Sequence, residues 1–213
     1  GFGYSLGYHK QRGCDVFGVE ADINAQRIAN HYGFNIHNGL FNSNVYEKEF
    51  FDYVTMDQVL EHTVEPIEIL NDISIVLKKG GSLVVSIPNA TGWGAKLFNR
   101  KWINWHIPYH LQHFSKKSFL ECVSRTNNLK VKEIKTITSS EWLYYQVLHL
   151  LTYPKIGQKS IFWSNDSTKR NISIKIVLKL VYILYKMKLF HIVTRIFDGL
   201  GMGDNMIIIM EKK

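Results

Sequence analysis

The stretch GFGYSL at residues 1–6, followed by VFGVEAD at residues 16–22, decides the fold of this 213-residue chain. It opens on a Gly-x-Gly turn, Gly1 and Gly3, and reaches an acid, Glu20, 17 positions after the second glycine. That spacing is close to the roughly 20-residue gap of a dinucleotide-type strand–helix–strand unit, which sets the acid against ribose hydroxyls. Because the turn of such a unit follows a buried parallel strand, we expect the first strand to be missing here and to lie before Gly1.

Apolar strands alternate with helical patterns downstream of this unit. After Pro66, apolar residues recur at helical spacing as far as Leu77, and Lys78-Lys79-Gly80-Gly81 predicts the end of that helix. Further helices are expected over 4–12 and after Asp22, which is a good N-cap. The expected strands cover 15–20, 34–37, 50–56, 82–87, 129–136 and 205–210. Strands that alternate with helices predict an α/β fold with a mostly parallel sheet.

Composition bounds the class of protein. Hydrophobic residues make up 46% of the chain, which is enough for a sizeable core. The two cysteines, Cys14 and Cys122, form no spacing motif, so a cytoplasmic location is favoured over a secreted one. No apolar run of about 18 residues lacks charge, so no membrane-spanning helix is expected. The net charge of +8 is typical of a lysine-rich bacterial composition.

Four ordered stretches resemble the class I S-adenosylmethionine-dependent methyltransferases. GFGYSL resembles the second half of their glycine-rich motif, and VFGVEAD resembles their second strand with its ribose-binding acid. FDYVTMDQVLEHTVEP at 51–66 and LKKGGSLVVSIPN at 77–89 resemble the fourth and fifth strands with their flanking segments. Within the class, the chain is most similar to the bacterial group that includes ubiquinone-biosynthesis and polysaccharide-locus methyltransferases, which IPYHLQHFSKKSF at 107–119 also resembles.

This resemblance implies a Rossmann-like sheet of seven strands, mostly parallel, with an antiparallel last strand and a helical insertion before it. It also implies S-adenosylmethionine as cofactor and S-adenosylhomocysteine as product. The chain then divides into a cofactor-binding core at 1–139, a helical insertion or cap at 140–200, and the last strand of the core at 201–213. A nicotinamide-dependent oxidoreductase is the less favoured alternative, because Leu6 stands where its third phosphate-loop glycine would be.

The cofactor-binding residues follow from the same resemblance. Glu20, with Ala21 after it, ends a strand and suits a bidentate grip on two ribose hydroxyls. The two glycines of the opening turn would let the backbone approach the amino-acid part of the cofactor. The remaining expected contacts lie near the adenine or at the methionine end: Asn38 and Gly39 for the former, and Met56, Asp57 and Gln58 for the latter. A plain Asn-Gly turn is an equal reading of Asn38 and Gly39.

Histidines are the candidates for proton transfer. Some relatives hold a divalent ion with acids and a histidine around Glu61 and His62, but Gln58 replaces one of those acids, so no metal is expected. Three histidines cluster in WHIPYHLQHF at 105–114, and His110 is the candidate catalytic base. The alternative is that these histidines only hydrogen-bond the backbone of an irregular loop. The tryptophans and Tyr109 nearby suit an acceptor pocket, a lid or the core equally well.

The segment 172–197 is apolar yet carries regularly spaced lysines, as an amphipathic interfacial helix does. It predicts peripheral contact with the inner face of an anionic membrane, against the alternative of a cap packed on the sheet or on a second subunit. Nucleic-acid binding is not expected, because the aromatic residues are mixed into apolar runs. The oligomeric state stays open.

The predicted function is methyl transfer to a hydroxyl of a glycan sugar, a lipid-linked acceptor or a small molecule, as in polysaccharide biosynthesis. The alternative from another class is a catalytically inactive binding or scaffold protein with the same fold. Methyl transfer needs little from the protein beyond alignment and desolvation, so the sequence need not contain an obvious catalytic group.

Overall fold

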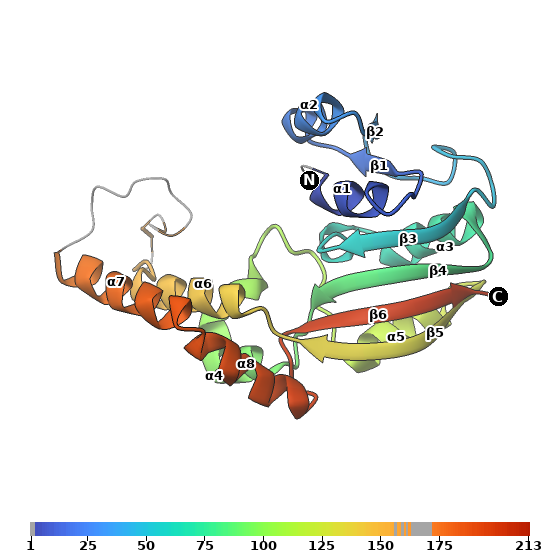
Figure 1. Ribbon diagram of the computed structural model, residues 1–213. Helices are drawn as coiled ribbons and strands as arrows, with labels where there is room; N and C mark the ends of the chain where they lie inside the picture. The colour runs from blue at the N-terminus through green and yellow to red at the C-terminus, as the bar shows by residue number, and fades with distance from the viewer. Residues whose placement is uncertain (1–2, 156, 159, 161, 163–171) are drawn as a thin grey trace.

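The computed structural model describes residues 3–155, 157, 158, 160, 162 and 172–213, and shows an α/β fold (Figure 1). Six strands lie in the described residues, grouped into a two-stranded and a four-stranded sheet. The first strand expected from the sequence would precede Gly1, so these residues do not test it. The expected strands at 15–20 and 34–37 and those that follow are all found, within a few residues of the predicted ends.

The smaller sheet carries the opening motif. Strand β1 (Phe17–Glu20) pairs in parallel with β2 (Asn35–Asn38), so that Glu20 lies opposite Asn38 at the carboxyl ends. Helix α1 (Tyr4–Lys10) precedes β1, and α2 (Ile23–His31) connects the two strands. The Asp22 side chain caps α2 by accepting a hydrogen bond from the Asn24 N–H, as expected.

The larger sheet has the order β3-β4-β6-β5. Strand β3 (Phe51–Asp57) is parallel to β4 (Leu77–Pro88), whereas β6 (Asn205–Lys212) runs antiparallel to β4 on one side and to β5 (Leu129–Ile137) on the other. The parallel pairs with an antiparallel last strand confirm the predicted fold class.

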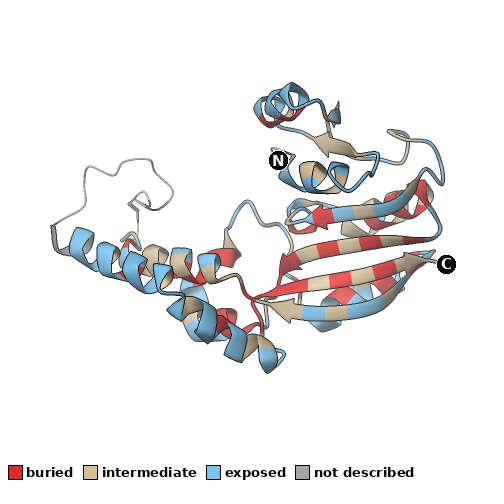
Figure 2. Ribbon diagram, in the orientation of Figure 1, coloured by how far each residue is buried: buried red, intermediate tan, exposed pale blue. Residues whose placement is uncertain are grey.

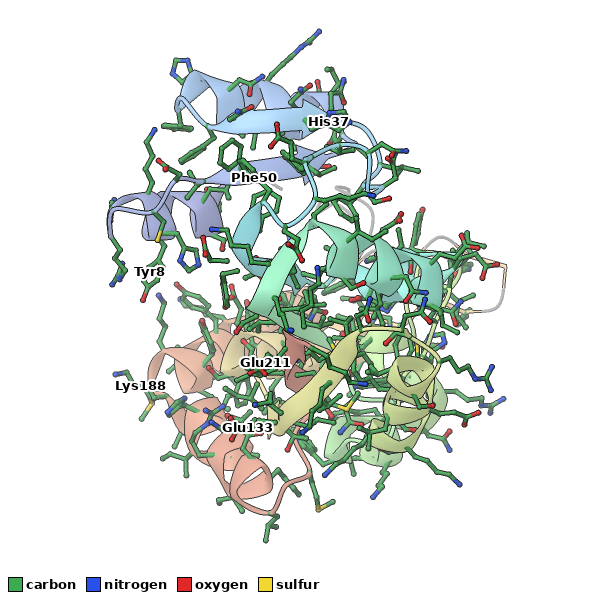
Figure 3. All side chains as sticks on the ribbon, turned by 90° about the vertical axis from the view of Figure 1, so that its right-hand side faces the viewer. Tyr8, His37, Phe50, Glu133, Lys188 and Glu211 are labelled. Carbon is green, nitrogen blue, oxygen red and sulfur yellow. The ribbon has the colours of Figure 1, made fainter. Side chains whose placement is uncertain are left out.

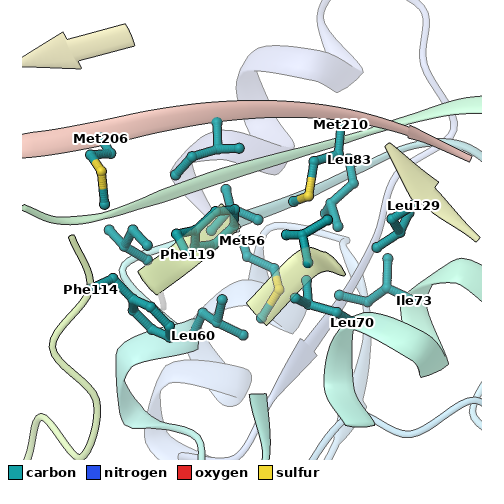
Figure 4. Packing of buried hydrophobic residues seen from close by; sticks show 14 of the residues in the cluster. Met56, Leu60, Leu70, Ile73, Leu83, Phe114, Phe119, Leu129, Met206 and Met210 are labelled. Atoms are coloured by element: carbon teal, nitrogen blue, oxygen red, sulfur yellow. The ribbon is translucent and has the colours of Figure 1, made fainter. Parts of the chain in front are cut away.

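The core lies on one face of this sheet, under α3 (Pro66–Val76) and α5 (Lys116–Ser124). Apolar side chains of the central strands point into it and alternate with more exposed ones, as the banding in Figure 2 shows. Figure 4 shows their packing. The fully buried members include Leu60, Leu70, Leu77, Leu83, Phe119, Met206, Ile208 and Met210.

One predicted boundary is wrong. The helix after Pro66 ends at Val76, one residue from the predicted end, but strand β4 begins at Leu77 and not at Ser82. The reason is tertiary: Leu77 pairs with Phe51 of β3, which draws residues 77–81 into the sheet.

The two sheets are joined by an aromatic cluster of Phe17, Tyr46, Phe50 and Phe51. Their rings meet mostly edge to face, with centroids 4.9 Å apart for Tyr46 and Phe51 and 5.2 Å apart for Phe17 and Phe50. The Tyr46 hydroxyl also donates a hydrogen bond of 3.0 Å to the Gly18 oxygen of β1. In Figure 3, Phe50 lies between the smaller sheet, on which His37 is labelled, and the larger one.

Helices α6 (Ser140–Leu151), α7 (Ile172–Lys186) and α8 (Leu189–Gly199) lie between β5 and β6 in the sequence and extend to one side of the sheet (Figure 1). They pack on one another, and α8 also contacts β5. No helix in the described ranges combines the length and the apolar character needed to cross a bilayer.

A buried acid, Asp204, just before β6, holds the segment that contains Gly94 and Trp102 against the sheet. Its carboxylate accepts hydrogen bonds from the Gly94 N–H of α4 (Trp93–Phe98) at 2.7 Å and from the Trp102 indole at 3.2 Å. Trp93 is also buried, donates to the Thr138 hydroxyl and stacks on Phe197 of α8. Trp93 and Trp102 are therefore core residues.

Candidate functional site

A cleft of about 980 Å³ runs between β1 and β3, which are not paired with each other. The strand expected before Gly1 would pair between these two strands, so only the end of the cleft at the carboxyl ends of the strands is a candidate ligand site. One end is formed at the carboxyl ends of the strands by Glu20, Ala21, Gly39, Met56 and Gln58. Ligands of open α/β sheets bind at this edge, in the crevice beyond the strand ends. Five of the predicted cofactor contacts thus line one cleft.

Glu20 lies at the end of β1, half-buried, with its side chain on the cleft. One carboxylate oxygen accepts a hydrogen bond of 2.8 Å from the Asp22 N–H, which fixes the direction of the side chain. Its backbone oxygen accepts from the Gly39 N–H at 3.1 Å, so the loops after β1 and β2 are held together. The ribose contact of Glu20 stays a prediction.

The opening turn is described from Gly3 onward, and Gly1 lies outside the described residues. Gly3 has φ 83°, a left-handed conformation that favours glycine, and precedes the first turn of α1. A side chain there would meet the Phe34 ring at 2.9 Å. Gly3 does not line the cleft, so the structure gives it a packing role in addition to the predicted approach to a ligand.

The other predicted contacts differ in how they face the cleft. Asn38 and Asp57 are exposed and do not line it. Met56 is largely buried in the core and also lines the cleft. Gln58 has φ 53° and uses its side-chain amide on Ser86 and Asn205 at 3.3 Å each, so it holds β3 against the neighbouring strands.

Four histidines gather beside this end of the cleft. The rings of His62 and His110 meet edge to face at 4.7 Å, and that of His106 lies 5.0 Å from His110. His62 lines the cleft, whereas His110, the predicted base, is not among its lining residues. The remaining member, His113, bonds the Trp105 oxygen through Nε2 at 3.0 Å.

In both His62 and His110, the Nδ1 atom faces a backbone oxygen. His62 Nδ1 lies 2.9 Å from the Tyr109 oxygen, and His110 Nδ1 lies 2.8 Å from the Asn104 oxygen. A carbonyl can only accept, so in both rings Nδ1 carries the proton and Nε2 has the lone pair. Burial lowers the pKa of His110 to about 4, which keeps this ring neutral near pH 7.

Glu61 lies next to this histidine cluster. It lies in the short 3-10 helix η1 (Leu60–His62) with an exposed fraction of 1%, and both of its carboxylate oxygens are buried without a hydrogen-bond partner among the described residues. Burial raises its pKa to about 7. One ligand atom each from Glu61, His62 and His110 lie within 4.8 Å of one another. Sequence reasoning missed this grouping, because 48 residues separate His62 from His110.

The tryptophans and Tyr109 of the loop at 102–113 are predicted to lie in an acceptor pocket, in a lid or in the core, and they differ in their burial. Trp102 is buried at 2% exposure on Asp204, whereas Tyr109 is 66% exposed. Trp105 donates its indole N–H to the Asn99 oxygen and lies edge to face with Trp102. Only Tyr109 is available to a lid or an acceptor pocket.

The fold and the cleft together define an α/β protein of the class I methyltransferase type. The chain belongs to the methyltransferase domain family, whose sequence profile matches residues 1–133. A comparison with curated proteins finds no match. Membership of the methyltransferase domain family identifies the protein as a methyltransferase, with S-adenosylmethionine as its cofactor.

Solved structures support the fold. An S-adenosylmethionine-dependent methyltransferase from Archaeoglobus fulgidus is 17% identical, with a TM-score of 0.56 over 100% of this chain and 82% of that one. A putative sarcosine dimethylglycine methyltransferase from Galdieria sulphuraria is 11% identical, with a TM-score of 0.59 over 99% and 75%. A geranyl diphosphate methyltransferase in complex with S-adenosylmethionine is 16% identical, with a TM-score of 0.54 over 100% and 74%.

Proposed function

We propose that the protein transfers the methyl group of S-adenosylmethionine to a hydroxyl of a sugar, lipid-linked or small-molecule acceptor. The observation that supports this proposal is the cleft that runs from the acid at the end of β1 to His62. A cofactor held by Glu20 at its ribose would extend along the strand ends toward the histidines. The acceptor would enter beside them.

The bound cofactor supplies a methyl group already activated on a sulfonium. What remains for the protein is to bind, align and exclude water. In this proposal Glu20 and Ala21 hold the ribose, Asn38 and Gly39 flank the adenine, and Met56 and Asp57 lie at the methionine end. Gly1, Gly3 and Gln58 complete the predicted set, with Gln58 as a positioning residue because its amide is used on Ser86 and Asn205.

The hydroxyl must lose a proton as it accepts the methyl group. His110 stays the predicted base, since its Nε2 carries a lone pair. A pKa of about 4 makes it a weak proton acceptor, however, because general bases work best when their pKa lies near the working pH.

Membrane-linked acceptors are favoured by the surface of α7. Several of its apolar side chains are exposed, including Ile176 at 57% and Leu180 at 56%, and Lys175, Lys179 and Lys186 are exposed between them. Apolar and cationic side chains together suit an anionic membrane surface. We therefore propose peripheral contact through 172–197 at the inner face of the membrane, for an enzyme of the cytoplasm that acts in polysaccharide biosynthesis.

Calorimetric titration of the folded chain with S-adenosylmethionine and with S-adenosylhomocysteine tests the cofactor assignment. Binding of both at micromolar affinity is expected. Incubation with labelled cofactor and a panel of sugars, lipid-linked sugars and small alcohols then tests transfer. Binding without transfer to any acceptor would favour a catalytically inactive binding protein, and binding of a nicotinamide dinucleotide in place of the sulfonium cofactor would favour an oxidoreductase.

A further inference from the structure

We propose that Glu61, His62 and His110 form a binding site for a first-row divalent metal ion such as Zn²⁺ or Fe²⁺. The sequence predicts no metal, because Gln58 stands where relatives have an acid. The structure brings in a different third ligand, His110, from a loop 48 residues away. Its ligand atom lies within 4.8 Å of those of Glu61 and His62.

The donor set decides the kind of metal. Two imidazoles and one carboxylate are the protein ligands of many catalytic zinc sites and of mononuclear iron sites, which keep further positions open for water or substrate. Mg²⁺ and Ca²⁺ prefer oxygen ligands, so they fit this set poorly. Ligand atoms around one zinc ion lie roughly 3.3 Å apart, given bonds of about 2.0–2.1 Å in a tetrahedron. The three ligand atoms lie within 4.8 Å of one another, so a small approach of the Glu61 carboxylate and the two rings would complete the site.

Both histidines are already oriented for coordination. The Nδ1–H of His62 donates to the Tyr109 oxygen and that of His110 to the Asn104 oxygen, which leaves the Nε2 lone pair of each ring for a metal. Metal-bound histidines commonly have such a bond from the second nitrogen to a carbonyl. These bonds would fix the ring directions before the metal arrives.

The buried carboxylate is the independent observation. Glu61 is 1% exposed, and neither oxygen has a hydrogen-bond partner among the described residues. A buried carboxylate without a partner is costly, and such groups are rare in folded proteins. A cation held between Glu61 and the two histidines would satisfy both oxygens.

The backbone supports the same grouping. The Glu61 oxygen accepts hydrogen bonds from the N–H groups of Leu111 at 2.8 Å and Gln112 at 3.0 Å, so the loop that carries His110 is attached directly to η1. Three ligands from two segments are therefore held by bonds that do not involve the ligand atoms. Because His62 also lines the cleft, the metal would stand beside the acceptor oxygen. With its Nε2 bound to the metal, His110 would not act as the base; this use of the metal rests on the proposed function, whereas the site itself does not.

Cobalt(II) chloride is the probe, because cobalt replaces zinc and iron in N/O sites and absorbs visible light according to its coordination. Calorimetry and absorption titration of the metal-free chain should show one Co²⁺ per chain with a Kd of about 10 µM or tighter. The variants Glu61→Gln, His62→Ala and His110→Ala should each bind at least tenfold more weakly. His113→Ala is the matched control, since it removes a histidine of the same loop outside the ligand set, and it should bind as the wild type does.

Circular dichroism and thermal melting establish that each variant is folded. If an alanine variant does not fold, Glu61→Gln still tests the site, because glutamine keeps the volume of the side chain. No stoichiometric cobalt binding by the folded wild type would overturn the proposal. Wild-type affinity for cobalt in the three ligand variants would overturn the proposal too. A loss of affinity in His113→Ala as large as in those variants would also overturn it. Titration of the same samples with S-adenosylmethionine keeps the two hypotheses apart: metal binding without cofactor binding would remove the proposed function and leave the metal site standing.

Discussion

At the scale of single residues, the candidate site depends on backbone conformations that few side chains adopt. Gly3, Gln58 and His106 have φ values of 83°, 53° and 36°. Non-glycine residues in this region are strained, and they persist where the surrounding structure holds them. Gln58 is held by its backbone N–H and its amide on β4 and β6, at the end of β3. Of the five non-glycine residues with positive φ among the described residues, Gln58 and His106 lie at the candidate site, and Glu49, Asn99 and Lys188 lie elsewhere.

Glu20→Ala should weaken S-adenosylmethionine binding by more than tenfold, which is about 1.4 kcal/mol or more. The substitution removes the carboxylate expected to accept hydrogen bonds from the ribose. Isothermal calorimetry measures the change. Asp15→Ala is the matched control, because Asp15 is an acid on the same cleft that precedes β1, at the opposite end of that strand. An affinity for Glu20→Ala within twofold of the control would refute the ribose role.

Gly94→Ala should destabilise the fold by about 1–3 kcal/mol, the usual cost of overpacking a filled core. A methyl group at Gly94 would overlap the carboxylate of Asp204, to which the Gly94 N–H donates. Denaturant unfolding measures the loss. Gly199→Ala is the control, since nothing lies within 4 Å of a methyl group there. It should leave stability unchanged or raise it slightly, because alanine is the better helix former; equal effects at both positions would contradict the packing argument.

At the scale of elements, α7 differs from the other helices in the character of its exposed side. Helix α3 buries Leu70 and Ile73 in the core, whereas the described part of α7 buries only Val181 and exposes most of its apolar residues. It packs on α6 and α8 through the remaining face. A helix with a large exposed apolar surface rimmed by lysines marks an interaction site.

Replacing Lys175, Lys179, Lys186 and Lys188 by alanine should abolish binding to anionic vesicles if 172–197 contacts membranes. Each basic residue near an anionic surface contributes about 1 kcal/mol, so four account for most of the attraction. Co-sedimentation with phosphatidylglycerol vesicles measures binding. The control removes four exposed lysines elsewhere: Lys48, Lys79, Lys116 and Lys117. Equal binding by both variants, or none by the wild type, would end the membrane proposal.

At the scale of the whole molecule, two sheets are joined by a small aromatic cluster and one of them carries most of the core. The larger sheet and its helices contain the core cluster, and only Ala25 and Ala29 are buried in the helix of the smaller sheet. The cleft lies where these two bodies separate. A ligand there would contact both, so cofactor binding should raise the melting temperature of the chain by mass action.

The pH dependence of stability should carry a component from Asp204, because burial raises the pKa of this acid from 3.8 to about 6. Between these values the folded protein keeps a proton that the unfolded chain has lost. The free energy of unfolding therefore falls as pH rises through this window, and the whole loss is present above about pH 6. Two pKa units correspond to about 3 kcal/mol.

Asp204→Asn removes this titration and keeps an acceptor for the Gly94 N–H. The wild type should lose about 2–3 kcal/mol more unfolding free energy than the variant does when the pH is raised from about 4 to about 7. Urea unfolding at the two pH values measures it, and the other titrating groups are common to both proteins. Parallel pH profiles for the two proteins would show that Asp204 titrates normally.

The sequence by itself determined the order of strands and helices and the fold class, because those depend on local patterns: apolar runs, caps, glycines, and an acid at the end of β1. The cofactor followed from the resemblance to a known family that four ordered stretches carry. Five of the predicted contacts meet in one cleft for the same reason, since the ends of parallel strands share one edge. Tertiary structure alone decided the rest. The early start of β4 depends on the pairing of Leu77 with Phe51, and the grouping of Glu61 with His110 depends on a loop folded back over 48 residues. Contacts between distant segments leave no spacing in the chain, so only the folded molecule brings those side chains together.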